Sequence, residues 1–219
     1  MPFCSCCRRE SSAFLPFGVR PRPGARCPHC GSLERHRLLS LFLSSRPALL
    51  TGRRRLLHIA PEPILQRLFR AAEVHYISAD LSARTDVRLD ITALPFADGS
   101  IDAVVCNHVL EHVPDDRAAM REFCRVLTPD GWAILQSPLD PNRASTYEDF
   151  SIQDPALRER AFGQFDHVRI YGRDYVSRLQ QSGFDVEAVP FADQLGARDA
   201  AHHGLKREEI MLCRPRLAA

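Results

Sequence analysis

The chain has 219 residues, of which 45% are apolar and 26% charged, the composition of an ordinary globular protein. This length can bury one good hydrophobic core together with a small appendage. No apolar run approaches the roughly 20 residues of a membrane-spanning helix, and the N-terminus MPFCSCCRRE lacks the hydrophobic stretch of a secretion signal. We therefore expect a cytoplasmic protein.

The net charge of +2 is unevenly distributed along the chain. Residues 1–55 hold 11 arginines against two acids, a net charge of +9, so that the remainder carries −7. A basic segment attracts nucleic acids and other polyanions. Lys206, however, is the only lysine among the 29 basic residues, which indicates a general compositional bias toward arginine. Nucleic acid is therefore possible as a partner but not favoured.

The first 30 residues contain five of the eight cysteines. Cys4-x2-Cys7 and Cys27-x2-Cys30 form two CxxC pairs separated by 19 residues. This spacing is typical of a zinc site in which four thiolates surround one tetrahedral ion and leave no open position for catalysis. Cys6 offers a replacement for Cys4 or Cys7, and free or oxidised thiols are the alternative to metal. We predict a zinc-ribbon-like module at 1–32 that binds one structural zinc ion.

Apolar residues at helical spacing predict a connecting helix over 33–50, ending near Pro47. Strands and helices then alternate over 51–219, which is typical of a parallel α/β sheet. Only LSARTD separates the second and third strands, so a loop is expected in place of a crossover helix. The polar segment 139–170 is predicted to be an insertion. The expected strands are 54–60, 74–80, 87–91, 103–108, 131–138, 185–191 and 209–215, and the expected helices of this region are 62–72, 115–127 and 171–184.

The longest informative stretch is LDITALPFADGSIDAVVCNHVLEHVPDDRAAMREFCRVLTPDGWAILQSP, residues 89–138. It resembles the class I S-adenosylmethionine-dependent methyltransferases, in particular the small-molecule branch of the ubiquinone-biosynthesis type. The resemblance covers 54–138 closely and the closing strands more loosely. It implies a Rossmann-like sheet, mostly parallel with an antiparallel last strand. It also implies an S-adenosylmethionine cofactor and methyl transfer to O, N or S of a small metabolite, such as one of specialised metabolism.

The first turn of this region, LLHIAPE at 56–62, departs from the family pattern. In the family the first strand ends in an acid followed by a glycine-rich turn. Here His58 stands in the acid's place and Ala60 in that of the first glycine. We predict that Glu62 takes over the acid's role and pairs with the cofactor's ammonium group. The alternative is that Glu62 only complements the dipole of the following helix.

The remaining cofactor contacts follow from the resemblance. Asp80 ends the second strand, where an acid can accept both ribose hydroxyls. Asp90 and Ile91 match the positions that meet adenine, and the Asn107-His108 pair lies beside the expected sulfonium. Turn or cap chemistry is the alternative for the two aspartates. The complete predicted set is His58, Ala60, Glu62, Asp80, Leu81, Asp90, Ile91, Asn107 and His108.

The insertion 139–170 and the residue just after it are expected to hold the substrate. His167 is the best general-base candidate, because a neutral imidazole accepts a proton near pH 7. Arg169 is expected to anchor a carboxylate or phosphate through a two-pronged contact. Tyr147, Asp166 and Tyr171 are predicted to line the same opening, and His108 is a further catalytic candidate. Methyl transfer can also proceed by alignment alone, and a loop hydrogen bond is the alternative for His167.

The sequence His108-x2-Glu111-His112 also resembles the inverted zinc-protease motif HxxEH. It falls in the strand-to-helix turn of the methyltransferase pattern, and no downstream glutamate ligand is evident, so a peptidase is not favoured. Three other functions stay open. They are an RNA methyltransferase, because some ribosomal-RNA methylators carry a Cys4 module before this fold, a non-catalytic scaffold, and transfer of the cofactor's aminocarboxypropyl arm.

Overall fold

The computed structural model describes residues 1–19, 21–52, 54–81 and 84–216. The chain forms two compact units built from interleaved segments. The first comprises Met1–Arg54, Pro61–His75 and Val189–Ile210, and the second comprises Arg55–Ala60, Tyr76–Ala188 and the residues from Met211 on. The linear division into 1–32, 33–50 and 51–219 stays a prediction. Among the described residues, no helix has the length and apolar character needed to cross a membrane.

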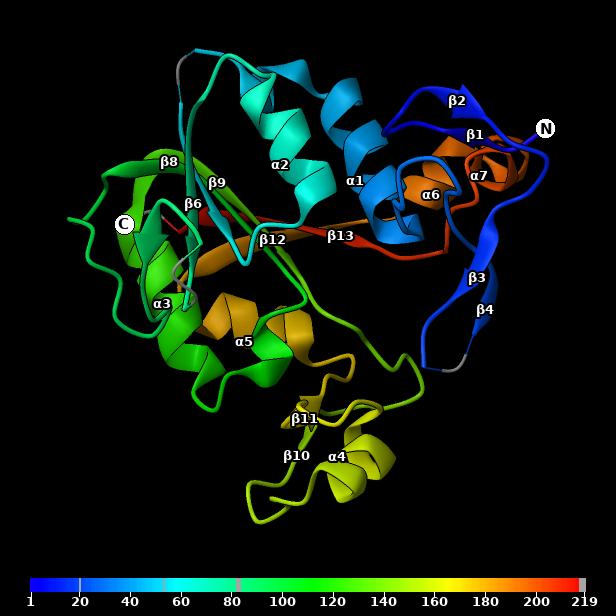
Figure 1. Cartoon of the computed structure of the whole chain (residues 1–219). Coiled ribbons are helices and arrows are strands. Elements are labelled where there is room, and N and C mark those ends of the chain that lie inside the picture. The colour runs from blue at the N-terminus through cyan, green and yellow to red at the C-terminus, as the bar shows by residue number, and fades with distance from the viewer. Residues whose placement is uncertain (20, 53, 82–83, 217–219) are drawn as a thin grey trace. The chain divides into compact units, whose positions relative to one another are not determined.

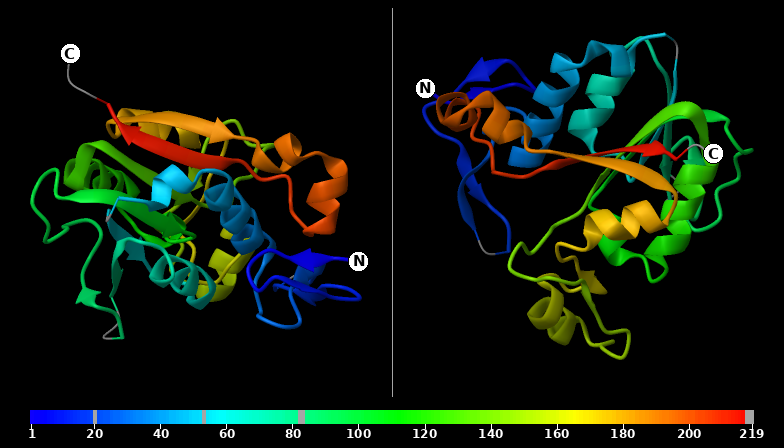
Figure 2. Two further views of the ribbon diagram at one scale, coloured as in Figure 1. Left: turned by 90° about the horizontal axis from the view of Figure 1, so that it is seen from above. Right: turned by 180° about the vertical axis from the view of Figure 1, so that it is seen from behind.

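A seven-stranded sheet organises the second unit, with the order β12-β13-β9-β8-β5-β6-β7. β5 pairs in parallel with β8, β8 with β9 and β6 with β7, whereas β13 is antiparallel to β9. This Rossmann-like sheet confirms the predicted fold class, and Figure 2 shows β12 and β13 side by side at its edge. The bounds are β5 Arg55–Ile59, β6 His75–Asp80, β7 Val87–Arg88, β8 Ile101–Asn107, β9 Leu127–Gln136, β12 Phe184–Val189 and β13 Ile210–Pro215.

The core of the second unit explains why the sequence forms these strands. β8 is a central strand, and its apolar run AVVC is fully buried, as expected for a parallel strand covered on both faces. α3 (Asp116–Val126) and α5 (Tyr175–Gln181) lie on one face of the sheet (Figure 1). Phe123 of α3 and Leu179 of α5 are fully buried in the same apolar cluster as β8. Asp115 caps α3 by accepting from the N–H of Ala118 over 2.8 Å.

The insertion folds into short elements of its own. β10 (Tyr147–Glu148) pairs antiparallel with β11 (Arg169–Ile170), whereas η2 (Leu110–His112) follows β8 and lies outside the insertion. α4 (Pro155–Phe162) lies between β10 and β11 in the chain. Asp154 caps its start by accepting from the N–H of Leu157 over 2.9 Å, and Gly163 ends it with a φ of +88°. The polar composition of the insertion predicted none of these elements.

The first unit combines two hairpins with helices. The bounds are β1 Phe3–Cys4, β2 Arg9–Glu10, β3 Leu15–Phe17, β4 Arg22–Arg26, α1 Glu34–Ser45, η1 Pro47–Leu50, α2 Pro63–Arg70, α6 Phe191–Leu195 and α7 Ala197–His202. The predicted connecting helix is divided, since α1 ends at Ser45 and η1 begins at Pro47. Phe42 of α1 contacts Phe191 of α6 edge to face, with ring centroids 5.4 Å apart.

Arg37 on α1 is fully buried in the first unit and holds distant segments together. Its Nε donates to the carbonyl of His203 over 2.7 Å, and its Nη1 donates to those of Ala25 and Ser32 over 3.0 and 2.9 Å. Nη2 donates to the carbonyl of Gly204 over 2.8 Å. A guanidinium offers five N–H donors in a fixed fork, so one side chain ties both sides of the second cysteine pair to the chain near 203.

Two strand boundaries differ from the sequence prediction by three residues or more. β7 stops at Arg88 because the next residues turn: Oδ1 of Asp90 accepts from the N–H and the hydroxyl of Thr92, each over 2.8 Å. β9 begins at Leu127, directly after α3, where its register against β8 shifts between Ile101 and Ala103. In the described part of 81–86 there is no helix, as expected.

Candidate functional site

The carboxyl ends of neighbouring parallel strands meet at one edge of the sheet. Ile59 of β5 lies opposite Cys106 of β8, and Asn107 of β8 lies opposite Gln136 of β9. Ala60 directly follows β5 and His108 directly follows β8, so both residues leave the sheet at this edge. Open α/β sheets bind ligands at this edge, which is where the predicted cofactor residues of the second unit fall.

Ala60 and His108 both adopt left-handed backbone conformations, with φ values of +45° and +54°. Among the described residues other than glycine, only Arg8 shares a positive φ. This conformation costs an L-residue roughly 1–2 kcal/mol, and such strain gathers at ligand sites. The N–H of Ala60 donates to the carbonyl of Ala79 over 2.8 Å, which fixes the turn. Ala60 thus supplies the backbone conformation that glycine adopts most readily.

The other predicted cofactor residues of the second unit differ in their accessibility. His58 is fully buried, with Nδ1 3.1 Å from the hydroxyl of Tyr76. Asp80 is half-buried at the end of β6, and Leu81 after it is 69% exposed. The carboxylate of Asp90 is committed in part to Thr92, whose N–H and hydroxyl lower its pKa. His58 therefore occupies the acid's place as an interior side chain.

Glu62 belongs to the first unit and stands at the start of α2, where α1 holds its carboxylate. Oε1 lies 3.1 Å from Nε of Arg35 and 2.7 Å from Nε2 of His36. Nδ1 of His36 accepts from the N–H of Leu33 over 3.1 Å, so Nε2 carries the hydrogen and donates to Glu62. Glu62 thus has a structural role, because it links α2 to α1. The sequence predicts a second role for it, as a partner of the cofactor.

A second group of polar side chains forms where η2 meets the end of the insertion. The metal-ligating atoms of Glu111, His112 and His167 lie within 4.8 Å of one another. The two imidazole rings meet edge to face, with centroids 4.6 Å apart. Burial lowers the pKa of His167, which favours the neutral ring. Burial opposes ionisation of Glu111, but the neighbouring imidazole of His108 outweighs it and lowers the pKa of Glu111.

The structure places two predicted substrate residues in the interior. Arg169 is 1% exposed: Nε donates to Oε2 of Glu148 over 2.9 Å, and Nη1 and Nη2 donate to the carbonyls of Leu110, Val113 and Pro114. That leaves one of its five N–H groups for any ligand. Tyr171 is fully buried and donates its hydroxyl to Asp116, so it does not reach a solvent opening.

Of the remaining substrate candidates, Tyr147 and Asp166 lie nearer the surface, whereas His167 is buried. Tyr147 is 37% exposed, with the guanidinium carbon of Arg143 5.4 Å from its ring centroid. Oδ2 of Asp166 lies 3.3 Å from Nδ1 of His112. Asp166 and His167 therefore belong to the group around Glu111, whereas Tyr147 packs against Phe162 at a ring-centroid distance of 5.5 Å.

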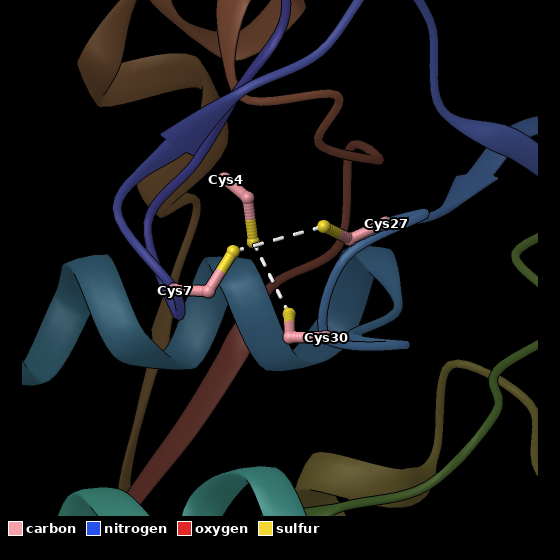
Figure 3. A group of neighbouring side chains, drawn as sticks. All are labelled: Cys4, Cys7, Cys27 and Cys30. Atoms are coloured by element: carbon pink, nitrogen blue, oxygen red, sulfur yellow. Dashed lines mark hydrogen bonds between the residues drawn. The ribbon is translucent and has the colours of Figure 1, made fainter.

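The four cysteines of the CxxC pairs converge in the first unit (Figure 3). The Sγ atoms of Cys4 and Cys30 lie 3.6 Å apart, and those of Cys7 and Cys27 3.8 Å apart. Bonds of about 2.3 Å from zinc to sulfur imply an edge of about 3.8 Å in a tetrahedron of thiolates. A disulfide would bring the sulfurs to about 2.05 Å, so these thiols are unbridged and spaced for a metal.

Crowding of the thiols gives the cluster an uneven charge. The hydrogen bond from Cys6 is the largest cause that lowers the pKa of Cys4, to about 3. Burial and the hydrogen bond with Cys4 raise the pKa of Cys7, and burial is the largest cause that raises that of Cys27. Four thiolates at this separation need a cation between them, and the donor set fits Zn²⁺.

Residues 62–135 match the family profile described as a methyltransferase domain. This segment of the chain is thus similar to a methyltransferase domain. The chain is 43% identical over 63 residues to an uncharacterized methyltransferase of Mycobacterium sp. (strain JLS), a match that covers 29% of this chain and 25% of that protein. It is 26% identical over 134 residues to the demethylmenaquinone methyltransferase of Mycobacterium marinum, covering 55% and 57%. The chain thus spans from a quarter to just over half the length of these relatives.

Solved structures agree with the fold of this chain. The [4+2]-cyclase SpnF superimposes with a TM-score of 0.59 at 17% identity, covering 89% of this chain and 87% of that chain. The methyltransferase CalH, in complex with S-adenosylhomocysteine (SAH), gives a TM-score of 0.50 at 20% identity, covering 84% and 56%. At such identities the likeness concerns the fold alone.

The sequence analysis missed the group around Glu111 as a unit. The sequence had pointed to its members separately, through the HxxEH motif, which was not favoured, and through His167 as a general-base candidate. Glu111 and His167 lie 56 positions apart, and only the folded insertion brings them together. Ser137, whose hydroxyl donates to Oε2 of Glu111 over 3.0 Å, carried no signal of its own.

Proposed function

We propose that the protein is an S-adenosylmethionine-dependent methyltransferase that acts on O, N or S of a small molecule. One observation carries the proposal. Ala60 and His108 hold strained, left-handed conformations directly after the carboxyl ends of β5 and β8, at the sheet edge where such folds bind ligands. A turn without glycine thereby keeps a backbone shape that lets a cofactor approach closely.

The cofactor contacts follow from the positions of the strand ends. Asp80 is assigned to the ribose hydroxyls, which a carboxylate at the end of the second strand can accept together. Asn107 and His108 are assigned to the vicinity of the sulfonium. Ile91, a buried apolar side chain, is assigned to the adenine ring. Glu62 is retained as the partner of the cofactor's ammonium group, in competition with its contacts to α1.

The insertion is assigned to the substrate, with His167 as the general-base candidate. The lowered pKa of His167 supports this role, because a neutral imidazole accepts a proton near pH 7. Aligning the nucleophile against the sulfonium supplies much of the rate in such a reaction. The named activity of the M. marinum relative supports a small-molecule acceptor.

The four converging cysteines are assigned to one structural zinc ion. The Sγ–Sγ distances of 3.6 and 3.8 Å support a tetrahedral site, and four thiolates leave no position open for a substrate. The zinc would link the turn after β1 to the turn after β4, and so stabilise hairpins that have little apolar core of their own.

Transfer of a labelled methyl group tests this function. The full chain would be incubated with methyl-labelled S-adenosylmethionine and, in separate reactions, with small phenols, amines and thiols and with total RNA. We expect label in at least one small acceptor and none in RNA. Label in RNA alone would show that the substrate is RNA and not a small molecule. Transfer of the cofactor's aminocarboxypropyl arm to the acceptor, in place of methyl, would identify an aminocarboxypropyl transferase.

A further inference from the structure

The group around Glu111 contains a buried carboxylate whose position needs an explanation. Glu111 is 1% exposed, and its Oε1 has no hydrogen-bond partner. Its other oxygen accepts from the hydroxyl of Ser137 over 3.0 Å. Nδ1 of His108 lies 3.5 Å from Oε1, outside normal hydrogen-bond distance. Oε1 thus has only this long contact to an imidazole to offset its burial, which is costly for a carboxylate, and it is available to a cation.

The two histidines offer ring nitrogens to the same place. Nδ1 of His167 lies 3.3 Å from the carbonyl oxygen of Phe162. Since a carbonyl only accepts, Nδ1 carries the hydrogen, and Nε2 keeps its lone pair. Nδ1 of His112 lies 3.3 Å from Oδ2 of Asp166, which favours the same tautomer. Ligating histidines typically bind a carbonyl or carboxylate through their second nitrogen.

The backbone around these side chains is tied into one piece. The N–H of Val168 donates to the carbonyl of Glu111 over 3.0 Å, which joins the His167 segment to η2. Arg169 donates to the carbonyl of Leu110 over 2.7 Å and to that of Pro114 over 2.8 Å, so it fastens both ends of the same turn. These contacts hold together the backbone segments that carry Glu111, His112 and His167, and they leave the three side chains free to bind an ion.

We propose that Oε1 of Glu111, Nε2 of His112 and Nε2 of His167 bind one divalent transition-metal ion of the zinc class. Two imidazoles and one carboxylate form a donor set that suits zinc and leaves a fourth position open. One ligating atom of each residue lies within 4.8 Å of the other two, and the three would move closer together around an ion at about 2.0–2.2 Å from each. His112 is partly exposed, so the metal has a route from solvent.

This site is independent of the cysteine cluster, but it shares His167 with the proposed substrate site, and Nε2 of His167 cannot bind a metal ion and act as the general base at the same time. The site lies in the second unit, whereas the four cysteines lie in the first. Its donors are nitrogen and oxygen, and its open position distinguishes it from a closed site of four thiolates. Metal binding therefore tests this assignment, whether or not the protein transfers methyl groups.

The test is the zinc content of the full chain after equilibration with zinc and removal of unbound ion. We expect wild type to hold one ion more than His167→Ala and His112→Gln, with the ion at the cysteine cluster retained in both variants. His75→Ala is the matched control, because His75 is an exposed histidine outside the group, and it should match wild type. His112→Gln alters a partly exposed side chain, so it is the variant best able to keep its fold.

Thermal denaturation provides a second readout on the same proteins. Zinc that binds the native state raises the melting temperature, and this rise should be smaller in His112→Gln than in wild type or His75→Ala. Equal zinc content in wild type, His112→Gln and His167→Ala would overturn the proposal. It would then follow that His108 alone balances the charge of Glu111.

Discussion

Nε2 of His36 donates a 2.7 Å hydrogen bond to Oε1 of Glu62, and Nε of Arg35 lies 3.1 Å from the same oxygen. The carboxylate that stands closest in sequence to the glycine-free turn is therefore already paired within the first unit. Glu62 has two candidate roles, as a tie between α1 and α2 and as a partner of the cofactor's ammonium. The two roles predict different responses to different ligands.

Glu62→Ala should weaken S-adenosylmethionine binding by at least roughly tenfold, the factor that about 1.4 kcal/mol implies. 5′-Methylthioadenosine lacks the ammonium group, so its affinity should be unchanged by the same substitution. Calorimetric titration of both ligands measures the difference. Arg35→Ala is the control, because it removes a tie to α1 but keeps the carboxylate. Equal weakening of both ligands would assign Glu62 to structure.

The left-handed turn makes a prediction about stability. Ala60→Gly should raise the free energy of unfolding by up to about 1 kcal/mol, because relief of about 1–2 kcal/mol of strain exceeds the added entropy of the unfolded chain. Ala79→Gly is the matched control, since Ala79 is a buried strand residue that accepts from the N–H of Ala60. It should lower stability, as glycine does within a strand. Urea denaturation measures both, and a loss at Ala60 as large as that at Ala79 would refute the strain argument.

The cysteine cluster predicts which thiols bind zinc. Cys27→Ser should remove one zinc ion per chain and lower the melting temperature, because folding of the hairpins depends on the metal. Cys6→Ser should retain that ion, since Cys6 is outside the group of four. Elemental analysis of reduced protein decides the matter. Retention of the ion in Cys27→Ser, or its loss in Cys6→Ser, would show a different ligand set.

Acid should weaken the contact between Glu122 and Arg125. The side-chain hydrogen bond with Arg125 is the main cause that lowers the pKa of Glu122, with Oε1 2.7 Å from Nε and Oε2 2.7 Å from Nη2. A depressed pKa stabilises the folded state above the unfolded value of about 4.3, and this contribution is lost as pH falls through the folded pKa. Glu122→Gln should therefore cost about 1–2 kcal/mol at pH 7 and progressively less below pH 4.

Urea denaturation between pH 7 and pH 3 checks this dependence. Glu159→Gln is the control, because Glu159 is exposed on α4. Its effect on the free energy of unfolding should be small throughout this range. A difference between wild type and Glu122→Gln that grows as the pH falls would contradict the assignment.

The sequence was sufficient to predict the sheet. The run AVVC predicted β8 because a strand covered on both faces needs continuous apolar residues, and the cysteine spacing predicted the group of four. The third strand was predicted too long. Asp90 and Thr92 form their turn through side-chain hydrogen bonds, which apolar patterning does not report.

The roles of the polar side chains were harder to predict, because they depend on burial. Arg169 and Tyr171 have the chemistry of substrate ligands, yet the structure turns both toward protein partners in the interior. Arg37 gave no signal, although it joins segments separated by more than 160 residues. The pairing of Glu111 with His167 likewise depends on how the insertion folds, which local sequence does not determine.

Calorimetric titration of S-adenosylmethionine into the full chain tests the central claim most directly. We predict saturable binding at a single site. Asp80→Asn should weaken it roughly tenfold or more, because the ribose hydroxyls lose a charged acceptor. Asp130→Asn, at an exposed position, should bind as wild type does. The absence of binding by folded wild-type protein would contradict the account and favour a non-catalytic scaffold.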